Sequence, residues 1–188
     1  MQTLFSADAP LVLLGCGNMG GALLKRWLEA GLTPDAVYII DPALSESAIR
    51  PDEFRGLKNA NIVKAACDLP KELTAKAVLI ASKPQMMPAV LPSIQSVISD
   101  NTLLLSVAAG TTIANFEAYF GADIQIIRTM PNTPAAVGAG ATGLVAKTNV
   151  TEAGRKTAQT LMQAVGETVW VENEALINVV TGVSGSGP

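Results

Sequence analysis

The glycine-rich turn over residues 15–20 constrains the fold of this chain more than any other feature of its sequence. It follows an apolar run over 11–14, which is typical of a buried strand, and it precedes an amphipathic helix pattern over 19–30. A strand, a glycine turn and a helix in this order form the phosphate-binding unit of dinucleotide-binding proteins. A glycine-rich turn without a ligand is the alternative, and the flanking strand and helix favour the dinucleotide.

Each glycine of the turn has an expected role. Gly15 permits a tight turn, Gly17 lets a pyrophosphate approach the backbone because it has no Cβ, and Gly20 lets the helix pack closely against the strand. The free N–H groups at the start of the helix then face the phosphates. The residues of the turn that are expected to bind the cofactor are Gly15, Gly17, Asn18, Met19 and Gly20.

Strand-like and helix-like runs alternate from residue 11 to residue 128. This alternation predicts an α/β fold with a Rossmann-like, doubly wound, mainly parallel sheet. The helices expected in this part cover 19–30, with Trp27 in the core, and 112–120. The expected strands cover 11–14, 37–40, 62–63, 78–81, 103–107 and 124–128.

The pattern changes after Thr129. Residues 138–143 are rich in glycine and alanine, and an edge strand is expected over 144–146. A helix over 151–165 and a last strand over 168–171 follow. Asn173 is a suitable cap for a further helix from Glu174 to Val180. The apolar side chains that this helix is expected to expose are Leu176, Ile177, Val179 and Val180.

Composition and charge exclude several classes of function. Apolar residues make up 49% of the 188 residues and charged residues 15%, which is typical of a globular protein with a large core. The net charge of −3 and the lack of a long basic run argue against nucleic acid as a partner. No apolar stretch is long enough to span a membrane and the N-terminus shows no signal pattern, so a cytoplasmic location is expected.

Histidine is absent from the chain, which removes the most common acid–base side chain and the most common metal ligand. The sequence also has no cysteine cluster with metal-ligand spacing, so no metal site is expected. The two cysteines, Cys16 and Cys67, are expected to be reduced, because a disulfide at Cys16 would obstruct the phosphate turn.

Asp41 is the expected ligand of the adenosine ribose. It closes the second predicted strand, 21 residues after Gly20, where an acidic side chain accepts hydrogen bonds from the ribose hydroxyls. Its sequence neighbours are not basic, so it predicts a preference for NADH over NADPH, although Lys83 can approach from another loop. The alternative is that Asp41 only starts a turn with Pro42.

Three more loops follow predicted strands at the edge where ligands bind in such sheets. The first holds Ala81, Lys83 and Pro84, and Lys83 either reaches a phosphate or ribose or is simply solvated. The second holds small residues that let a flat ring lie against the backbone or that merely suit a tight turn: Ala108, Ala109 and Gly110. In the third, two prolines stiffen a loop in which Asn132 and Thr133 either orient a substrate or form an ordinary turn.

Together these residues resemble pyrroline-5-carboxylate reductase over nearly the whole chain. The resemblance rests on the glycine turn and on residues 81–84, 108–110, 130–134 and, above all, 181–188, which read Thr-Gly-Val-Ser-Gly-Ser-Gly-Pro. It implies reduction of the cyclic imine 1-pyrroline-5-carboxylate to L-proline with NADH or NADPH. It also implies that Ser184, Gly185 and Ser186 contact the substrate together with Asn132 and Thr133.

The resemblance implies a division of the chain into a cofactor domain over 1–172 and the first helix of an all-helical dimerisation domain over 173–188. The rest of that domain supplies the catalytic groups and makes the enzyme a homo-oligomer, so no residue of this chain is assigned a catalytic role. The chain alone is accordingly expected to bind cofactor but to reduce the imine poorly. Ser82 stands where valine is usual in the family, and this change is expected to be tolerated.

Two other functions remain open from the sequence. A related imine reductase or β-hydroxyacid dehydrogenase shares the same glycine turn and differs in the catalytic groups of its helical domain. A module that binds NAD(H) without turnover is the alternative from a different class, but such a module has no need of the Ser-Gly-Ser-Gly-Pro string over 184–188.

Overall fold

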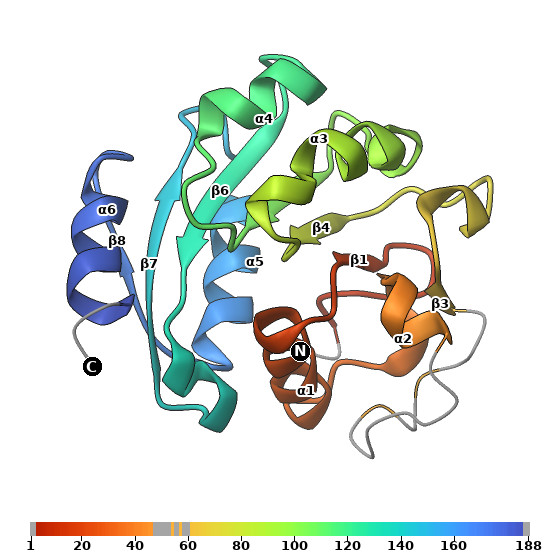
Figure 1. The fold of residues 1–188 in the computed structure, drawn as a ribbon, viewed down its shortest axis with the longest axis horizontal. Coiled ribbons are helices and arrows are strands. Elements are labelled where there is room, and N and C mark those ends of the chain that lie inside the picture. The colour runs from red at the N-terminus through yellow and green to blue at the C-terminus, as the bar shows by residue number, and fades with distance from the viewer. Residues whose placement is uncertain (1–2, 47–53, 55–56, 58–60, 186–188) are drawn as a thin grey trace.

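The computed structural model describes residues 3–46, 54, 57 and 61–185. Within these residues, eight strands form one sheet in the order β3-β2-β1-β4-β5-β6-β7-β8 (Figure 1). The strands are β1 (Leu11–Leu14), β2 (Val37–Ile40), β3 (Ile62–Val63), β4 (Ala77–Ile80), β5 (Leu103–Ser106), β6 (Gln125–Met130), β7 (Gly140–Ala146) and β8 (Gly166–Trp170). Neighbouring strands are parallel except for β6 and β7. The predicted Rossmann-like, mainly parallel sheet is therefore confirmed.

Helices cover both faces of this sheet, as the doubly wound fold requires (Figure 1). The α-helices are α1 (Asn18–Glu29), α2 (Pro42–Glu46), α3 (Met87–Val90), α4 (Ile113–Phe120), α5 (Glu152–Gln163) and α6 (Leu176–Val180). Short 3-10 turns connect them, at Pro34–Ala36, Ala66–Asp68, Pro84–Met86, Pro92–Val97 and Thr133–Val137, and Thr181–Gly185 forms one π-helical turn after α6.

The sheet separates two hydrophobic clusters, one under each layer of helices. Every residue of β1, β4 and β5 is buried, which explains why these strands are continuous apolar runs and do not alternate. On one face, Trp27 of α1 is fully buried and its Nε1 donates a hydrogen bond to the carbonyl of Leu161 in α5 (2.8 Å). The expected core position of Trp27 is confirmed, and this bond ties two helices far apart in sequence. On the other face, Phe116 of α4 is fully buried.

The predicted strands at 11–14, 37–40 and 62–63 have the observed bounds, and the other predicted elements before residue 130 differ by one or two residues. The expected edge strand at 144–146 is wrong in length and in position. β7 begins at Gly140 and lies between β6 and β8, so that β8 forms the edge. The glycines of β7 explain the difference, because a Cβ at Gly140 or Gly143 would lie 3.0 Å or less from atoms packed against the strand. The residues rich in glycine and alanine before Leu144 therefore belong to the strand and serve close packing.

The last helix also differs from the prediction. α6 begins at Leu176 instead of Glu174, and Asn173 accepts a hydrogen bond from the Leu176 N–H through Oδ1 (3.3 Å). The expected exposure of Ile177 is wrong, since only 1% of it is accessible, and Val180 packs over Gly143.

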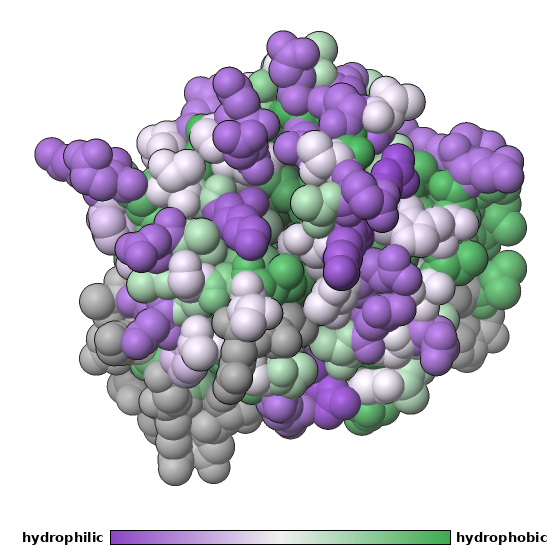
Figure 2. All heavy atoms as spheres, turned by 180° about the vertical axis from the view of Figure 1, so that it is seen from behind, coloured by the Kyte–Doolittle hydropathy of each residue, from purple (hydrophilic) through white to green (hydrophobic). Residues whose placement is uncertain are grey.

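Exposed apolar residues do gather on this side of the molecule, where Figure 2 shows a hydrophobic area at its right-hand edge. They are Val169, Leu176, Val179 and Val183. None of the helices among the described residues is long and apolar enough to cross a bilayer.

Two buried threonines test how hydrogen bonds contribute to the stability of this core. Thr102 Oγ1 donates to the carbonyl of Ala75 (2.7 Å), whereas Thr142 Oγ1 in β7 has no partner among the described residues. Replacing threonine by valine keeps the shape and removes the hydroxyl. We expect Thr102→Val to lower the free energy of unfolding by about 1–3 kcal/mol and Thr142→Val to leave it unchanged or raise it. Urea denaturation measures both, and equal losses would contradict the assignment.

Candidate functional site

The glycine turn joins β1 to α1 with the geometry expected for a phosphate-binding loop. Gly15 has a φ of 90°, which residues with a Cβ rarely adopt. A Cβ at Gly20 would lie 2.2 Å from the carbonyl oxygen of Gly15 and 3.1 Å from Cβ of Ala81 after β4. The predicted roles of Gly15 in the tight turn and of Gly20 in close packing are therefore confirmed.

Gly17 differs from these two glycines because neither its backbone angle nor its described surroundings require a glycine. Its φ of −71° suits any residue, and apart from its chain neighbours no atom of the described residues lies within 4 Å of the position that its Cβ would take. Gly17 is also the N-cap of α1, where it provides no side chain to bind the first N–H groups of the helix. Open space thus lies over N–H groups that carry the positive end of the helix dipole, with Asn18 and Met19 in the first turn of α1.

Asp41 ties the end of β2 to this turn. Its Oδ2 accepts a hydrogen bond from the backbone N–H of Cys16 (2.7 Å), and its Oδ1 accepts one from the N–H of Leu44 in α2 (2.9 Å). Sequence reasoning missed the contact with Cys16, whereas the contact with Leu44 agrees with the alternative that Asp41 starts a turn with Pro42. A carboxylate has about four acceptor positions, so hydrogen bonds to a ribose remain possible and that role stays a prediction.

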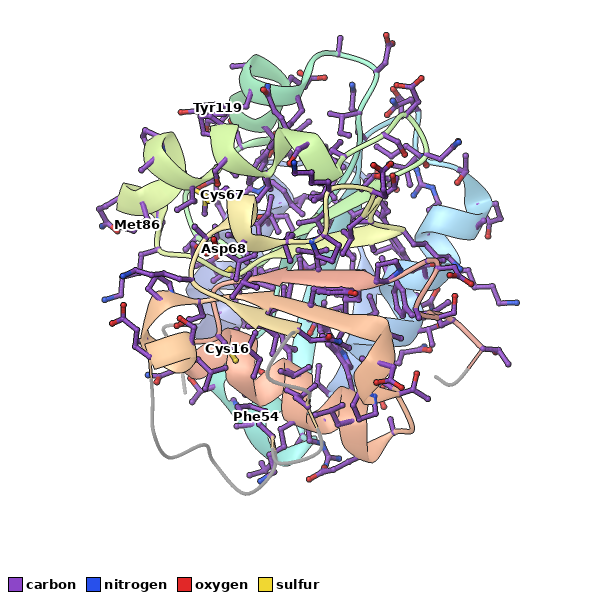
Figure 3. The ribbon with its side chains drawn as sticks, turned by 90° about the vertical axis from the view of Figure 1, so that its right-hand side faces the viewer. Cys16, Phe54, Cys67, Asp68, Met86 and Tyr119 are labelled. Carbon is purple, nitrogen blue, oxygen red and sulfur yellow. The ribbon has the colours of Figure 1, made fainter. Side chains whose placement is uncertain are left out.

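A cavity of about 420 Å³ opens beside the turn, at the carboxyl ends of β1, β2, β3 and β4. From β1 the strand order proceeds through β2 to β3 on one side, and from β4 it proceeds to β8 on the other side. The position between β1 and β4 is therefore the switch point, where doubly wound sheets bind ligands. Figure 3 shows the sheet nearly edge-on, with Cys16 below it and Met86 above it. The predicted residues that the fold brings together here are Gly15, Gly17, Asp41, Ala81 and Lys83.

Lys64 also lines this cavity, and sequence reasoning missed it. It follows β3 directly, and the N–H of Asp41 donates to the carbonyl of the preceding residue, Val63 (3.0 Å). Its Nζ lies 2.6 Å from Oε1 of Glu46 at the end of α2. The hydrogen bond to Glu46, and then the charge of Glu46, raise the pKa of Lys64. The sequence neighbours of Asp41 are not basic, yet the fold places a lysine beside it, and the preference for NADH stays a prediction.

The loop after β5 lies farther along the same edge of the sheet. Ala108 is buried, whereas Ala109 and Gly110 are exposed. Gly110 has a φ of 74°, and in the described part of the chain no atom beyond its neighbours lies within 4 Å of a Cβ position. Gly110 borders a second cavity, of about 340 Å³, with Arg128 and Glu174. The loop after β5 is therefore two strands away from the glycine turn after β1. Pro84 follows β4, the strand between them.

Glu174 joins three segments around this second cavity. Its Oε1 accepts hydrogen bonds from the buried guanidinium of Arg128 in β6 and from the N–H of Ile113 at the start of α4 (2.8 Å). The bond to a charged guanidinium is stronger than a neutral one. This pair fixes the segment before α6 against the sheet, and the sequence pattern did not indicate it.

The predicted substrate residues are only partly described. Asn132 Oδ1 accepts a hydrogen bond from the N–H of Ala141 (2.8 Å), which ties its loop to β7, and Thr133 is exposed at the start of the next turn. Ser184 and Gly185 end the π-helical turn after α6, and Ser186 lies outside the described residues. Their contacts with a substrate stay predictions.

The two cysteines should differ in the reactivity of their thiols. Burial, and then the nearby charge of Asp41, raise the pKa of the Cys16 thiol to about 12, whereas Cys67 is exposed. Since the thiolate is the reactive form, we expect Ellman's reagent at pH 8 to label one thiol rapidly. The raised pKa predicts that the rate at Cys16 continues to increase up to about pH 12. The Cys67→Ser variant should lose the fast phase of labelling, whereas the Cys16→Ser variant should retain it. Rapid labelling of Cys16 in the Cys67→Ser variant would contradict this assignment.

Comparison with known proteins agrees with this geometry. The family described as NADP oxidoreductase coenzyme F420-dependent matches residues 10–110 of the 188. The chain is 35% identical to the pyrroline-5-carboxylate reductase of Haemophilus influenzae over 178 residues, which are 95% of this chain and 63% of that protein. The chain thus spans less than two thirds of the length of this relative.

Two solved structures are also similar. The structure of a pyrroline-5-carboxylate reductase from Coxiella burnetii superposes with a TM-score of 0.81 at 28% identity, and covers 96% of this chain and 65% of that one. The Plasmodium falciparum pyrroline carboxylate reductase with NADP bound has a TM-score of 0.78 at 23% identity, over 97% of this chain and 64% of that one. At this lower identity the likeness shows the fold alone.

Proposed function

The chain belongs to the family described as NADP oxidoreductase coenzyme F420-dependent, and we propose that it is the dinucleotide-binding part of a pyrroline-5-carboxylate reductase. The open space over Gly17, at the N-terminus of α1 and at the switch point of the sheet, is the observation that carries this proposal. The similarity to reductases of that name over 95% of the chain supports the choice of reaction.

We infer that NADH or NADPH lies along the carboxyl edge of the sheet. The pyrophosphate occupies the open space over Gly17 and the first turn of α1, and the adenosine lies toward Asp41 on the side of β2 and β3. The nicotinamide half then extends the other way, past the loops after β4 and β5. The residues proposed to line that half are Ala81, Lys83, Pro84, Ala108, Ala109 and Gly110.

When bound, a reduced nicotinamide supplies a hydride for the carbon of the C=N bond of 1-pyrroline-5-carboxylate. The contribution of this chain is to hold the dinucleotide rigidly and to orient it, an effect that reaches about 7–11 kcal/mol in favourable cases. We propose that residues 1–172 form this cofactor domain and that residues 173–188 begin the helical domain of the reductase. The substrate contacts proposed for this chain involve Asn132 and Thr133 and the backbone around Ser184 and Gly185.

We also propose that the whole protein is a homo-oligomer that acts on a small molecule. The exposed apolar side chains of β8 and of the segment around α6 support an association on that side.

Gly17→Val tests the cofactor site directly. The valine side chain would occupy the space assigned to the pyrophosphate, while no described residue lies close enough to clash with its Cβ. We expect the variant to stay folded, with a somewhat lower urea midpoint because valine is a poorer N-cap than glycine, and to bind NADH and NADPH at least about tenfold more weakly. The affinity falls because the phosphate can no longer reach the helix N–H groups. Titration followed by nicotinamide fluorescence measures the affinity. An unchanged affinity in a folded variant would show that the phosphate lies elsewhere.

The substrate is tested on the protein at its natural length. We expect oxidation of NADPH or NADH that depends on 1-pyrroline-5-carboxylate and yields L-proline, whereas an acyclic 3-oxo acid should not be reduced. The second acceptor represents the β-hydroxyacid dehydrogenases, which share the glycine turn. If the protein reduced the oxo acid and not the cyclic imine, the proposed reaction would be wrong, although the dinucleotide site would stand.

A further inference from the structure

The ion pair at the adenosine end of the cavity has no role in the function proposed so far. We propose that Lys64 recognises the 2′-phosphate that distinguishes NADPH from NADH, and that Glu46 limits this recognition by competing for the same lysine. This inference rests on the proposed dinucleotide binding and adds to it a pair of residues that determines cofactor preference.

The position of Lys64 follows from the sheet. β2 and β3 are parallel neighbours, with Ile40 paired to Val63, so that the residues after them, Asp41 and Lys64, emerge side by side at the carboxyl edge. Both residues line the same cavity. In folds of this kind the residue at the end of the second strand marks the position of the ribose 2′-hydroxyl. A phosphate on that hydroxyl would therefore lie within the surroundings of Asp41 and Lys64.

The charges at this end explain why a single acidic residue does not decide the preference. Asp41 accepts hydrogen bonds from the N–H groups of Cys16 and Leu44, and these two donors offset part of its repulsion toward an anion. Lys64 lines the same cavity as Asp41, and its charge is already shared with Glu46, whose Oε1 lies 2.6 Å from Nζ. Among the described residues at this end, the charges of Asp41, Lys64 and Glu46 contribute to the potential at the 2′ position.

The ion pair between Lys64 and Glu46 can be broken in favour of another anion at little cost in free energy. Their side chains are 65% and 62% exposed, and solvent screens an ion pair of this kind strongly. A phosphate carries nearly two negative charges at neutral pH and has three acceptor oxygens, so it is a stronger partner for an ammonium group than one carboxylate is. The 2′-phosphate therefore replaces Glu46, and Glu46 reduces the gain because it must be displaced.

The other lysine of the cavity, Lys83, has a different position and should act differently. It follows β4, which lies on the opposite side of β1 from β2 and β3. Lys83 is thus placed toward the pyrophosphate and the nicotinamide half, which NADH and NADPH have in common. The strand order separates a lysine that distinguishes the cofactors from a lysine that serves both.

NADPH and NADH differ only in the 2′-phosphate, so their affinities test this inference. Both affinities are measured by isothermal titration calorimetry at low ionic strength. We expect Lys64→Gln to lower the affinity for NADPH about tenfold and to change the affinity for NADH by less than about twofold. Glu46→Gln should raise the affinity for NADPH about threefold and leave that for NADH unchanged, because the competing carboxylate is gone. In the wild type, raising the salt concentration should weaken the binding of NADPH more than the binding of NADH, since exposed charges are screened.

Two further variants provide controls. Lys83→Gln should lower the affinities for both cofactors alike. Lys71→Gln removes the same charge from an exposed residue ahead of β4, and it should change neither affinity. Circular dichroism checks that each variant is folded. If Lys64→Gln weakened both cofactors equally, or neither, or if Glu46→Gln did not favour NADPH, the inference would be overturned. If the wild type bound neither cofactor, the proposed function itself would be wrong, and this inference with it.

Discussion

The absence of a side chain at Gly20 is the constraint on which the rest of the site depends. A Cβ there would overlap the carbonyl oxygen of Gly15, so only glycine lets α1 start so close to the end of β1. That approach brings the first N–H groups of α1 to the carboxyl edge of the sheet and places the turn against Ala81 after β4. The burial of α1 through Trp27, which hydrogen-bonds to Leu161 in α5, then holds the helix in this position.

Asp41 adds an electrostatic link between the turn and the neighbouring strands. Its carboxylate binds the N–H of Cys16 and caps α2, and its own N–H binds the carbonyl of Val63 at the end of β3. The same links bring Lys64, with its partner Glu46, to the end of the cavity where we propose that the adenosine lies. One residue therefore shapes the turn, places a negative charge near the Cys16 thiol, and connects the strand and helix that position Lys64 and Glu46.

Local patterns were sufficient to predict part of this structure. The strand, turn and helix over residues 11–30 are encoded by neighbouring residues, and the predicted β1, α1 and roles of Gly15 and Gly20 are confirmed. Features that depend on partners distant in sequence were missed. The first half of the strand at Gly140–Ala146 was not predicted, because its glycines serve packing against α6 and the turn before it. Ile177 was expected to be exposed, but it is buried in α6, which contacts β6 and β7. Lys64 could have been found only by noticing that it follows the strand paired with β2.

The placement of the dinucleotide that we propose, across the carboxyl edge of the sheet with its pyrophosphate over Gly17, can be tested residue by residue. The measurement is a titration of ¹⁵N-labelled protein with NADPH, followed by the backbone amide signals in two-dimensional NMR. We expect the largest shifts at Gly17, Asn18 and Met19, with smaller ones after β2, β4 and β5. Shifts confined to the opposite edge of the sheet, such as the cavity lined by Asp100 and Asp123, or no shifts at all, would contradict it.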